Sequence, residues 1–525
     1  MRDFHLPGRS AVFAANGLCA TSHPIAALVA IECLKKGGNA IDAAISASLV
    51  LGIAEPQMTG IGGDCFALLT PPGEDRILAL NASGRAPMAA DPEALRTAGH
   101  QKIPDHGVEA VTLPGAIAGF CKLSEDWGKL GLADLVAPAI HYAEEGIPVA
   151  PRTAFDWAGF AARATGAARE YYLLNGADPR AGKVFRAPGQ AEVLRRVASE
   201  GPKGFYQGEV AADMVTALRA AGGVHTEADF AAVEADWVTP VSGAYNGVEL
   251  VEHPPNSQGT AAILLANILQ QFDLSALDPW GTERLHIEAE ATKLAYDARN
   301  RFLADADHVT RLDHLMAPDT AKQLAALIDP GRVLAFGPGP SEAIHRETIY
   351  ITVVDKDRMC VSLIYSIFHD FGSGIASPKF GVLLHNRGAG FSLEPGHPNE
   401  YGPGKRPMHT IIPAMLKQGG KTVMPFGVMG GAYQAAGHAR FLTNVVDFNL
   451  SPQDAIDGPR SFAIDGELRV ERGYSDTVRA ELSALGHNVV VPDAPIGGAQ
   501  AIRIHPDGIL EAGSDPRKDG CALGY

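Results

Sequence analysis

The stretch Glu347-Thr348-Ile349-Tyr350-Ile351-Thr352-Val353-Val354-Asp355 places a threonine at the start of a run of β-branched and aromatic residues. Residues of these kinds favour a β-strand, because their side chains pack well on a pleated surface. Residues 355–358 are typical of a turn, and residues 359–367 form a second, largely apolar run. The sequence therefore predicts a β-hairpin with Thr348 at the start of its first strand.

Side-chain parity predicts how the two strands of this hairpin pair. Setting Ile349 opposite Tyr365 gathers the apolar side chains on one face, whereas a shift by one residue would place apolar residues opposite polar ones. The same register sets Thr348 opposite Ser366 on the other face. A second hydroxyl group is thus expected beside Thr348.

Thr348 would become a nucleophile if the chain were cut between Glu347 and Thr348. A threonine hydroxyl is weak until a base removes its proton, and a freed α-amine with a pKa near ~7.7–8.0 can act as that base. Residues 329–341 are rich in Gly and Pro, which exclude a helix or a central strand and predict an exposed loop that could be cut. An ordinary interdomain linker before a buried, non-catalytic strand is the open alternative.

The composition indicates a globular enzyme and excludes some classes of partner. The 525 residues are 46% hydrophobic and 20% charged, and the net charge of -16 argues against a nucleic-acid or anionic-membrane partner, which would require clustered Lys and Arg. No run reaches the ~18 apolar residues of a membrane span. The six cysteines show no Cys-x-x-Cys spacing, which favours a reducing compartment, so we expect a cytoplasmic protein.

Local patterns predict several further elements. Residues 24–36 have helical spacing, and Asn39 caps a second helix that runs to about residue 53. The glycines at 60, 62 and 63 precede a strand at 65–69, an order that excludes a nucleotide-binding loop and predicts a tight turn. Residues 115–325 have mainly helical patterns, with a strand near 248–252.

A strand at 422–429, the pair Gly430-Gly431 and a helix at 432–446 follow one another in the C-terminal part of the chain. Backbone N–H groups near the start of a helix can bind a negative charge that develops on oxygen. Gly430 and Gly431 are therefore candidates for an oxyanion hole. A tight turn with no catalytic role is the alternative.

His286 and Glu290 lie four residues apart on a predicted helix, a spacing that can hold a metal ion. Helical His and Glu at this spacing are also common by chance, and the sequence offers no evident third ligand. We therefore expect neither a metal nor any other cofactor.

Together these pieces resemble the γ-glutamyltranspeptidase family of N-terminal-nucleophile hydrolases. The likeness spans nearly the whole chain and rests on motifs at 20–24 (Ala-Thr-Ser-His-Pro), 37–44 (Gly-Gly-Asn-Ala-Ile-Asp-Ala-Ala), 255–259 (Pro-Asn-Ser-Gln-Gly) and 457–460 (Asp-Gly-Pro-Arg). Thr348 and residues 353–355 also match the start of the family's small chain, whereas residues 349–352 differ from it.

The resemblance implies a four-layer αββα sandwich of the α/β (α+β) class, made from a large chain, 1–347, and a small chain, 348–525. It implies self-cleavage between Glu347 and Thr348, with Thr348 as the nucleophile. By the same resemblance Ser366 is the second hydroxyl, and Gly430 and Gly431 form the oxyanion hole. The enzyme would then consist of two chains of one precursor, and a dimer of such heterodimers is left open.

The positions that hold the substrate depart from the glutamyl pattern of the family. Gly390 stands where typical members carry the acid that pairs with the glutamyl amine. Ser83 stands where they carry the arginine that binds the carboxylate, with Arg85 two residues further on. The other replacements are Phe368 and Arg387 for an asparagine and a glutamine, and His409-Thr410 for a pair of serines.

These changes remove recognition of an amine while keeping or adding cationic groups. The favoured acyl group would therefore carry a carboxylate but no α-amine. The alternative is that Arg85 and Arg387 are structural or face the solvent.

These observations predict a self-processing amidohydrolase that cleaves a small-molecule amide through an acyl-enzyme on Thr348. A γ-glutamyl compound such as glutathione is the default substrate of the family. The nearest enzymatic alternative is an acylase or small-amide hydrolase, like the family's cephalosporin-acylase-like and oxamate-hydrolase-like branches. An unprocessed binding protein with the same fold is the non-enzymatic alternative.

Overall fold

The computed structural model describes residues 5, 8–334 and 348–525, so Glu347 and the rest of 335–347 lie outside the described residues.

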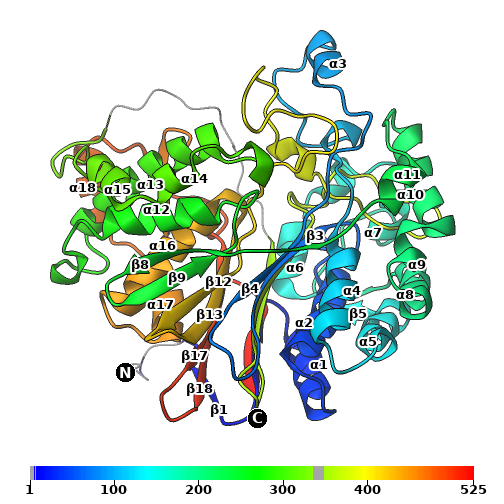
Figure 1. The fold of residues 1–525 in the computed structure, drawn as a ribbon, viewed down its shortest axis with the longest axis horizontal. Coiled ribbons are helices and arrows are strands. Elements are labelled where there is room, and N and C mark those ends of the chain that lie inside the picture. Colours follow the sequence, from blue (N-terminus) through cyan, green and yellow to red (C-terminus); the bar gives the residue numbers. More distant parts are fainter. Residues whose placement is uncertain (1–4, 6–7, 335–347) are drawn as a thin grey trace.

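Two seven-stranded antiparallel sheets form the centre of the molecule (Figure 1). Sheet 1 has the order β19 (Cys521–Gly524), β2 (Leu18–Thr21), β10 (Ile349–Val354), β11 (Cys360–Ser366), β3 (Asp64–Thr70), β4 (Leu78–Ala82), β7 (Asp236–Val238). Sheet 2 has the order β1 (Val12–Ala14), β18 (Leu510–Ser514), β17 (Gly498–Ile504), β13 (Lys421–Met429), β12 (Ala414–Gln418), β9 (Val248–Glu252), β8 (Val241–Tyr245). Two small sheets combine β14 (Ser461–Ile464), β15 (Glu467–Val470) and β16 (Val489–Val490), and β5 (Ile147–Pro148) and β6 (Val184–Phe185).

Helices form an outer layer on each side of the paired sheets (Figure 1). On the side of sheet 1 lie α1 (Pro24–Lys35), α2 (Ala40–Ala54), α4 (Ala116–Trp127), α5 (Leu132–Glu145) and α8 (Pro188–Glu200), and on the side of sheet 2 lie α12 (Gly259–Leu269), α13 (Thr282–Phe302) and α16 (Gln434–Val446). Shorter helices are α3 (Pro92–Thr97), α6 (Pro151–Trp157), α7 (Gly166–Tyr172), α9 (Lys203–Tyr206), α10 (Gly208–Ala220), α11 (Glu227–Ala231), α14 (Leu312–Met316), α15 (Pro318–Ala325), α17 (Pro452–Asp457) and α18 (Asp476–Ala484). Within the described ranges, none of the helices combines the length and the apolar character that a membrane crossing requires.

The two faces of β10 show how the layers are held together. Ile349, Ile351 and Val353 pack in one apolar core with residues of α1 and α2. Tyr350, on the opposite face, packs against Met429 of sheet 2. Because each sheet buries one face against helices and the other against the second sheet, the fold is the expected four-layer αββα sandwich.

The predicted hairpin is confirmed in its elements and its register. Strands β10 and β11 pair with Ile349 opposite Tyr365. In the turn between the strands, Asp355 accepts the backbone N–H groups of Asp357 at 2.9 Å and Met359 at 3.1 Å. Strand β10 lies between β2 and β11, so it is a central strand of sheet 1 and not an edge.

The predicted helical pair is also present. Helix α2 begins after Asn39, whose side chain accepts the N–H of Asp42, while the Asp42 carboxylate accepts the N–H of Asn39. This reciprocal capping box supplies partners for N–H groups that a helix start leaves unpaired. Asp355 also accepts the N–H of Ala40 at 3.0 Å, which ties the start of α2 to the hairpin turn.

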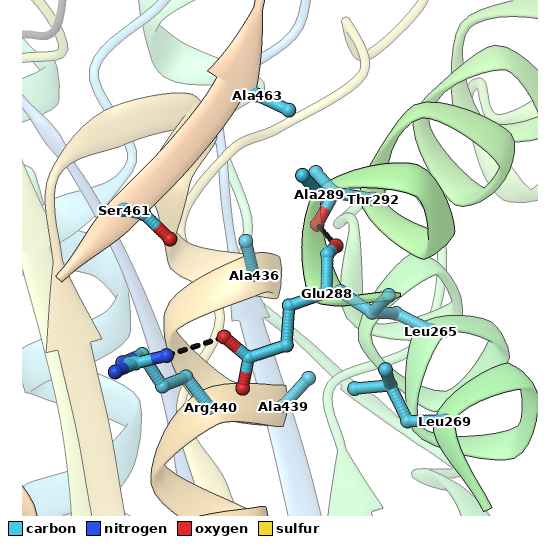
Figure 2. A pocket seen from close by; sticks show the side chains of 10 residues that line it. All are labelled: Leu265, Leu269, Glu288, Ala289, Thr292, Ala436, Ala439, Arg440, Ser461 and Ala463. Carbon is cyan, nitrogen blue, oxygen red and sulfur yellow. Dashed lines mark hydrogen bonds and ion pairs between the residues drawn. The ribbon is translucent and has the colours of Figure 1, made fainter. Parts of the chain in front are cut away.

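A buried ion pair holds α13 against α16 in the outer layer on sheet 2, as Figure 2 shows. Glu288 of α13 accepts from Arg440 of α16, and its other oxygen accepts from Arg284 Nε at 2.9 Å. The surrounding side chains are apolar or small and come from α12, α13, α16 and β14: Leu265, Leu269, Ala289, Ala436, Ala439 and Ala463. A buried charge requires a partner, so this pair fixes the position of α16 on α13.

The glycines that precede β3 form the predicted tight turn. A Cβ atom on Gly62 would lie 2.2 Å from the Leu383 carbonyl oxygen, and one on Gly63 would lie 2.3 Å from the Ser366 carbonyl oxygen. Only glycine permits backbone segments to approach this closely. The turn thereby lets the start of β3 pair with the end of β11, where Ser366 lies.

We expect Gly63→Ala to destabilise the fold by about 1–3 kcal/mol, because the added methyl group would overlap the Ser366 carbonyl oxygen. Denaturant unfolding and the melting temperature of the purified protein measure this effect. Gly131→Ala is the matched control, since Gly131 has a φ of -79° and nothing packed within 4 Å of its Cβ position. Equal stability of the two variants would contradict the steric explanation.

Candidate active site

Thr348 lies at the start of β10, and the register of sheet 1 aligns further polar residues with it. Thr348 Oγ1 is 2.9 Å from Ser366 Oγ, so the expected second hydroxyl is in the predicted place. Ser366 in turn pairs with Asp64 at the start of β3. Ser83 directly follows β4 and lies opposite Asp64. This placement follows because Cys65 and Ala82, the neighbours of Asp64 and Ser83, are paired in the sheet. These polar side chains form a buried row across four strands.

The hydroxyl of Ser366 is oriented by its partners. Its Oγ accepts the backbone N–H of Phe368 at 2.9 Å. Because that amide can only donate, the hydroxyl proton of Ser366 is available to Thr348 Oγ1. A bond of this kind orients the Thr348 hydroxyl and would stabilise negative charge on its oxygen.

Gly430 and Gly431 occupy the junction between β13 and α16. Their φ values of 124° and 56° lie in the region that favours glycine. Met429, directly before the pair, packs against Tyr350, which follows Thr348 by two residues on the same face of β10. The glycine pair therefore lies at the same end of the two sheets as Thr348.

Gln258 connects the glycine pair to the segment that holds Thr410. Its Nε2 donates to the carbonyl oxygen of Thr410 at 2.6 Å and to that of Gly431 at 3.2 Å. Its Oε1 accepts from Arg299 of α13 at 2.8 Å. Gln258 is fully buried, so these three bonds fix its amide and, through it, the backbone of Gly431.

Comparison with known proteins decides the family of the chain. The family model described as Gamma-glutamyltranspeptidase matches residues 26–525. The chain belongs to the gamma-glutamyltranspeptidase family. A glutathione hydrolase-like YwrD proenzyme of Bacillus subtilis is 34% identical over 98% of this chain and 99% of its own length. An oxamate amidohydrolase proenzyme of Klebsiella pneumoniae is also 34% identical, over 97% of this chain and 98% of its own length. The crystal structure of a cephalosporin acylase from Bacillus halodurans superposes with a TM-score of 0.93 at 36% identity, covering 100% of this chain and 99% of that one.

Membership of the gamma-glutamyltranspeptidase family makes the chain a hydrolase or acyltransferase of the N-terminal-nucleophile class, that is, an amidohydrolase. The similarity covers nearly the whole length of these relatives, all of which are named as hydrolases or acylases. The non-enzymatic alternative is therefore set aside.

In this member of the gamma-glutamyltranspeptidase family, Asp64 is the centre of a buried charged cluster next to β11. Its Oδ1 accepts the backbone N–H groups of Gly84 at 3.0 Å and Gly115 at 3.2 Å. Its Oδ2 lies 3.1 Å from His409 Nε2 and 3.2 Å from His385 Nδ1. Burial raises the pKa of Asp64, but the two histidines lower it by more, so the pKa lies well below its ordinary value. Asp64 is thus a carboxylate with both oxygens engaged.

His409 is a neutral donor in this cluster. Its Nδ1 accepts the N–H of Ile411 at 3.3 Å, which places the ring proton on Nε2, facing Asp64. Burial, together with the nearby charge of Arg387, lowers the pKa of His409 to about 3. At neutral pH the imidazole therefore orients Asp64 without adding charge to the site.

Arg387 is fully buried, so the solvent-facing alternative is wrong for this residue. Its guanidinium carbon lies 4.0 Å from the ring centroid of Phe368, Nη1 donates to Thr410 Oγ1 at 2.9 Å, and Nε is 4.0 Å from Asp64 Oδ2. Phe368 has a φ of 74°, a strained value for a residue with a Cβ atom, and its N–H is held by Ser366. The structure thus builds Arg387 into the wall next to the hydroxyl pair.

The structure brings most of the predicted site residues together, but Arg85 lies apart from them. The side chain of Arg85 is 44% exposed, and its Nη1 contacts Asp305 at 3.3 Å and the Gly404 carbonyl oxygen at 2.9 Å. Arg85 and Ser83 line a cavity of about 330 Å³ next to α11. Arg85 therefore lies at this partly exposed cavity, whereas Arg387 contacts Phe368, whose N–H donates to Ser366.

Sequence reasoning did not single out Asp64, His385 or Gln258 as site residues. Asp64 directly follows the glycine run at 60–63 and Gln258 lies in the motif at 255–259, but neither pattern by itself indicates a role in the site. No local pattern shows that the strand after Asp64 pairs with the strand of Ser366, or that His385 reaches the same carboxylate. Sheet order and loop packing decide these contacts.

We expect Gln258→Ala to lower kcat by about 10- to 100-fold with a smaller change in KM, because the backbone of Gly431 loses the donor that positions it. Gln258→Glu should be no better, since it keeps an acceptor for Arg299 but turns a carboxylate toward two carbonyl oxygens. Steady-state kinetics measure both effects, with the exposed Gln271→Ala as the control. A normal kcat for Gln258→Ala would rule out the positioning role.

Proposed function

We propose that the chain is cleaved between Glu347 and Thr348, and that Thr348 then hydrolyses a small amide whose acyl group carries a carboxylate but no α-amine. The observation that carries the proposal is the 2.9 Å contact between Thr348 Oγ1 and Ser366 Oγ at the start of a central strand. Cleavage would yield a large chain, 1–347, and a small chain, 348–525. The description of the relatives from Bacillus subtilis and Klebsiella pneumoniae as proenzymes supports this processing.

After cleavage, Thr348 would supply both the nucleophile and the base. An α-amine with a pKa near ~7.7–8.0 takes the proton from Oγ1 as this oxygen attacks the carbonyl carbon of the amide. The negative oxygen that forms is stabilised by the backbone N–H groups of Gly430 and Gly431. The ammonium then protonates the leaving amine, the C–N bond breaks, and an ester on Thr348 remains. Water, deprotonated by the same amine, hydrolyses this ester and releases the acid.

Arg387 supports recognition of a carboxylate on the acyl group. A buried guanidinium group binds a carboxylate through charge-assisted hydrogen bonds that can be bidentate. Thr410 and Phe368 hold Arg387 from two sides, which limits the conformational entropy that binding would cost. Oxamate, the substrate named for the Klebsiella pneumoniae relative, is an amide with a carboxylate and no α-amine, so it belongs to the proposed class.

Two observations on the described residues argue against a carboxylate beside Arg387 that would pair with an α-ammonium. Gly390 has no side chain, and both oxygens of Asp64 already accept hydrogen bonds or face histidine nitrogens. A γ-glutamyl amide remains the second candidate, because the Bacillus subtilis relative is described as glutathione hydrolase-like. The two candidate substrates differ in whether the acyl group carries an α-amine.

We expect Thr348→Ala to abolish both cleavage and amidase activity, because the variant lacks the attacking oxygen for both reactions. Electrophoresis and intact mass should then show an uncut chain of 55.2 kDa, whereas wild-type protein should give a fragment starting Thr-Ile-Tyr. Thr352→Ala, on the same face of β10, is the matched control and should be cleaved normally. Wild-type protein that stays intact yet hydrolyses amides would refute the proposed nucleophile.

We expect a glutaryl anilide to be hydrolysed with a kcat/KM at least about tenfold higher than the γ-glutamyl anilide, which differs only by the α-amine. Arg387→Gln should lower kcat/KM for the glutaryl compound by about 10- to 100-fold, the effect of one lost charge-assisted interaction. Arg85→Gln should change it by less than about threefold, since Arg85 lies apart from the hydroxyl pair. A clear preference for the γ-glutamyl anilide would instead support the second candidate.

A further inference from the structure

Three buried side chains outside the active site place their metal-binding atoms close together. His286 and Glu290 lie one turn apart on α13, and His487 follows α18, which packs beside α13 (Figure 1). In the described part of the chain, these three offer one ligand atom each, and the atoms lie within 4.8 Å of one another. The third candidate ligand, which the sequence did not reveal, is therefore His487. The proposed amidase chemistry uses none of these groups.

Hydrogen bonds from the backbone orient the ligand atoms of this cluster. The Asp329 carbonyl oxygen can only accept, so the 2.8 Å contact with His286 Nε2 places the ring proton there and leaves a lone pair on Nδ1, facing His487. Glu290 Oε2 accepts the N–H of Leu334 at 2.7 Å, which leaves Oε1 toward the cluster. Metal-bound histidines and carboxylates characteristically have such outer partners, because these partners fix the tautomer and the orientation of each ligand.

The spacing of the three atoms suits a small divalent ion. His286 Nδ1 is 2.8 Å from His487 Nε2, and His487 Nε2 is 4.0 Å from Glu290 Oε1. Ligands at about 2.0–2.1 Å from tetrahedral zinc are separated by about 3.3 Å, which lies between these two distances. The third separation, between His286 Nδ1 and Glu290 Oε1, is at most 4.8 Å, so side-chain shifts of up to about 1.5 Å would complete the coordination.

A positive charge already sits at one side of the cluster. Lys293 Nζ is 2.6 Å from Glu290 Oε1, the oxygen that would bind the metal. The side chain of Lys293 is 20% exposed, so its ammonium group can turn toward the solvent and make room for an ion. Lys293 would thus compete with a metal ion for the carboxylate and weaken its binding.

We propose that His286, Glu290 and His487 bind a zinc-like divalent ion, with water as the fourth ligand and Lys293 displaced. Two imidazoles and one carboxylate are a ligand set that zinc prefers. His286 and Glu290 precede residue 348 and His487 follows it, so after the proposed cleavage the ion would join the large chain to the small one. Only this bridging consequence rests on the proposed function; the binding itself does not.

Zinc binding to the full-length protein tests the proposal directly. Chelator-treated protein is incubated with zinc chloride, passed through a desalting column and analysed for metal, and calorimetry gives the Kd. We expect about one zinc ion per chain in wild type, and the same in uncleaved Thr348→Ala, which separates this test from the test of processing. Zinc should also raise the melting temperature of the processed protein. Wild-type protein that retains no zinc would overturn the proposal.

Variants assign the bound ion to this cluster. His487→Ala should abolish zinc binding, while His505→Ala, a half-buried histidine paired with Glu511, should leave it unchanged. Lys293→Met should lower the Kd by about tenfold, because the competing ammonium is removed. If His487→Ala does not fold, Glu290→Gln provides the same test, with binding weaker by at least about tenfold. Zinc retained equally by the ligand variants would place the ion elsewhere and overturn the assignment.

Discussion

The antiparallel pairing of β10 with β11, and of β11 with β3, is the constraint on which the site depends. Pairing across a sheet places residues in register on the same face, so the start of β10, the end of β11 and the start of β3 must lie side by side. Thr348, Ser366 and Asp64 occupy these three positions. A slip of one residue would turn Thr348 toward the helices and bury apolar side chains against polar ones, so the large apolar core under β10 enforces the register.

A second constraint comes from the charge buried beside this row. Asp64 is removed from water, which is tolerable only because two backbone N–H groups and two histidines surround it. Those partners come from segments far apart in the chain. The Asp64 carboxylate therefore holds these segments together beside the hydroxyl groups of Thr348 and Ser366. Arg387 stacks on Phe368 at the edge of the same cluster, so a buried positive charge lies beside the carboxylate.

Helix α13 serves the site from the layer outside sheet 2. Its Glu288 fixes α16, which starts just after the glycine pair, and its Arg299 orients Gln258, which bonds to Gly431. His286 and Glu290, on the same helix, meet His487 from beyond residue 348. Helix α13 can thus position the backbone around Gly431 from the outer layer, because both contacts are buried and hydrogen-bonded.

Much of the architecture follows from local sequence. The hairpin and its register, the helical pair closed by Asn39, and the strand, glycine pair and helix around Gly430 were predicted from side-chain alternation, capping and glycine placement, and the structure has them. The contact between Thr348 and Ser366 could also be predicted from local sequence, because the two strands of a hairpin are neighbours along the chain. Arg387 in the wall of the site followed from family resemblance, but its complete burial did not.

The sequence alone determined which residues alternate, cap and turn, because those properties depend on neighbours a few positions away. Tertiary structure alone decided that Asp64 lies beside Ser366, that His385 and His409 share its carboxylate, and that His487 meets His286 and Glu290. These contacts join segments tens to hundreds of residues apart, and they arise from sheet order and from the packing of four layers. No short-range pattern encodes them, since burial of the whole apolar core selects them together.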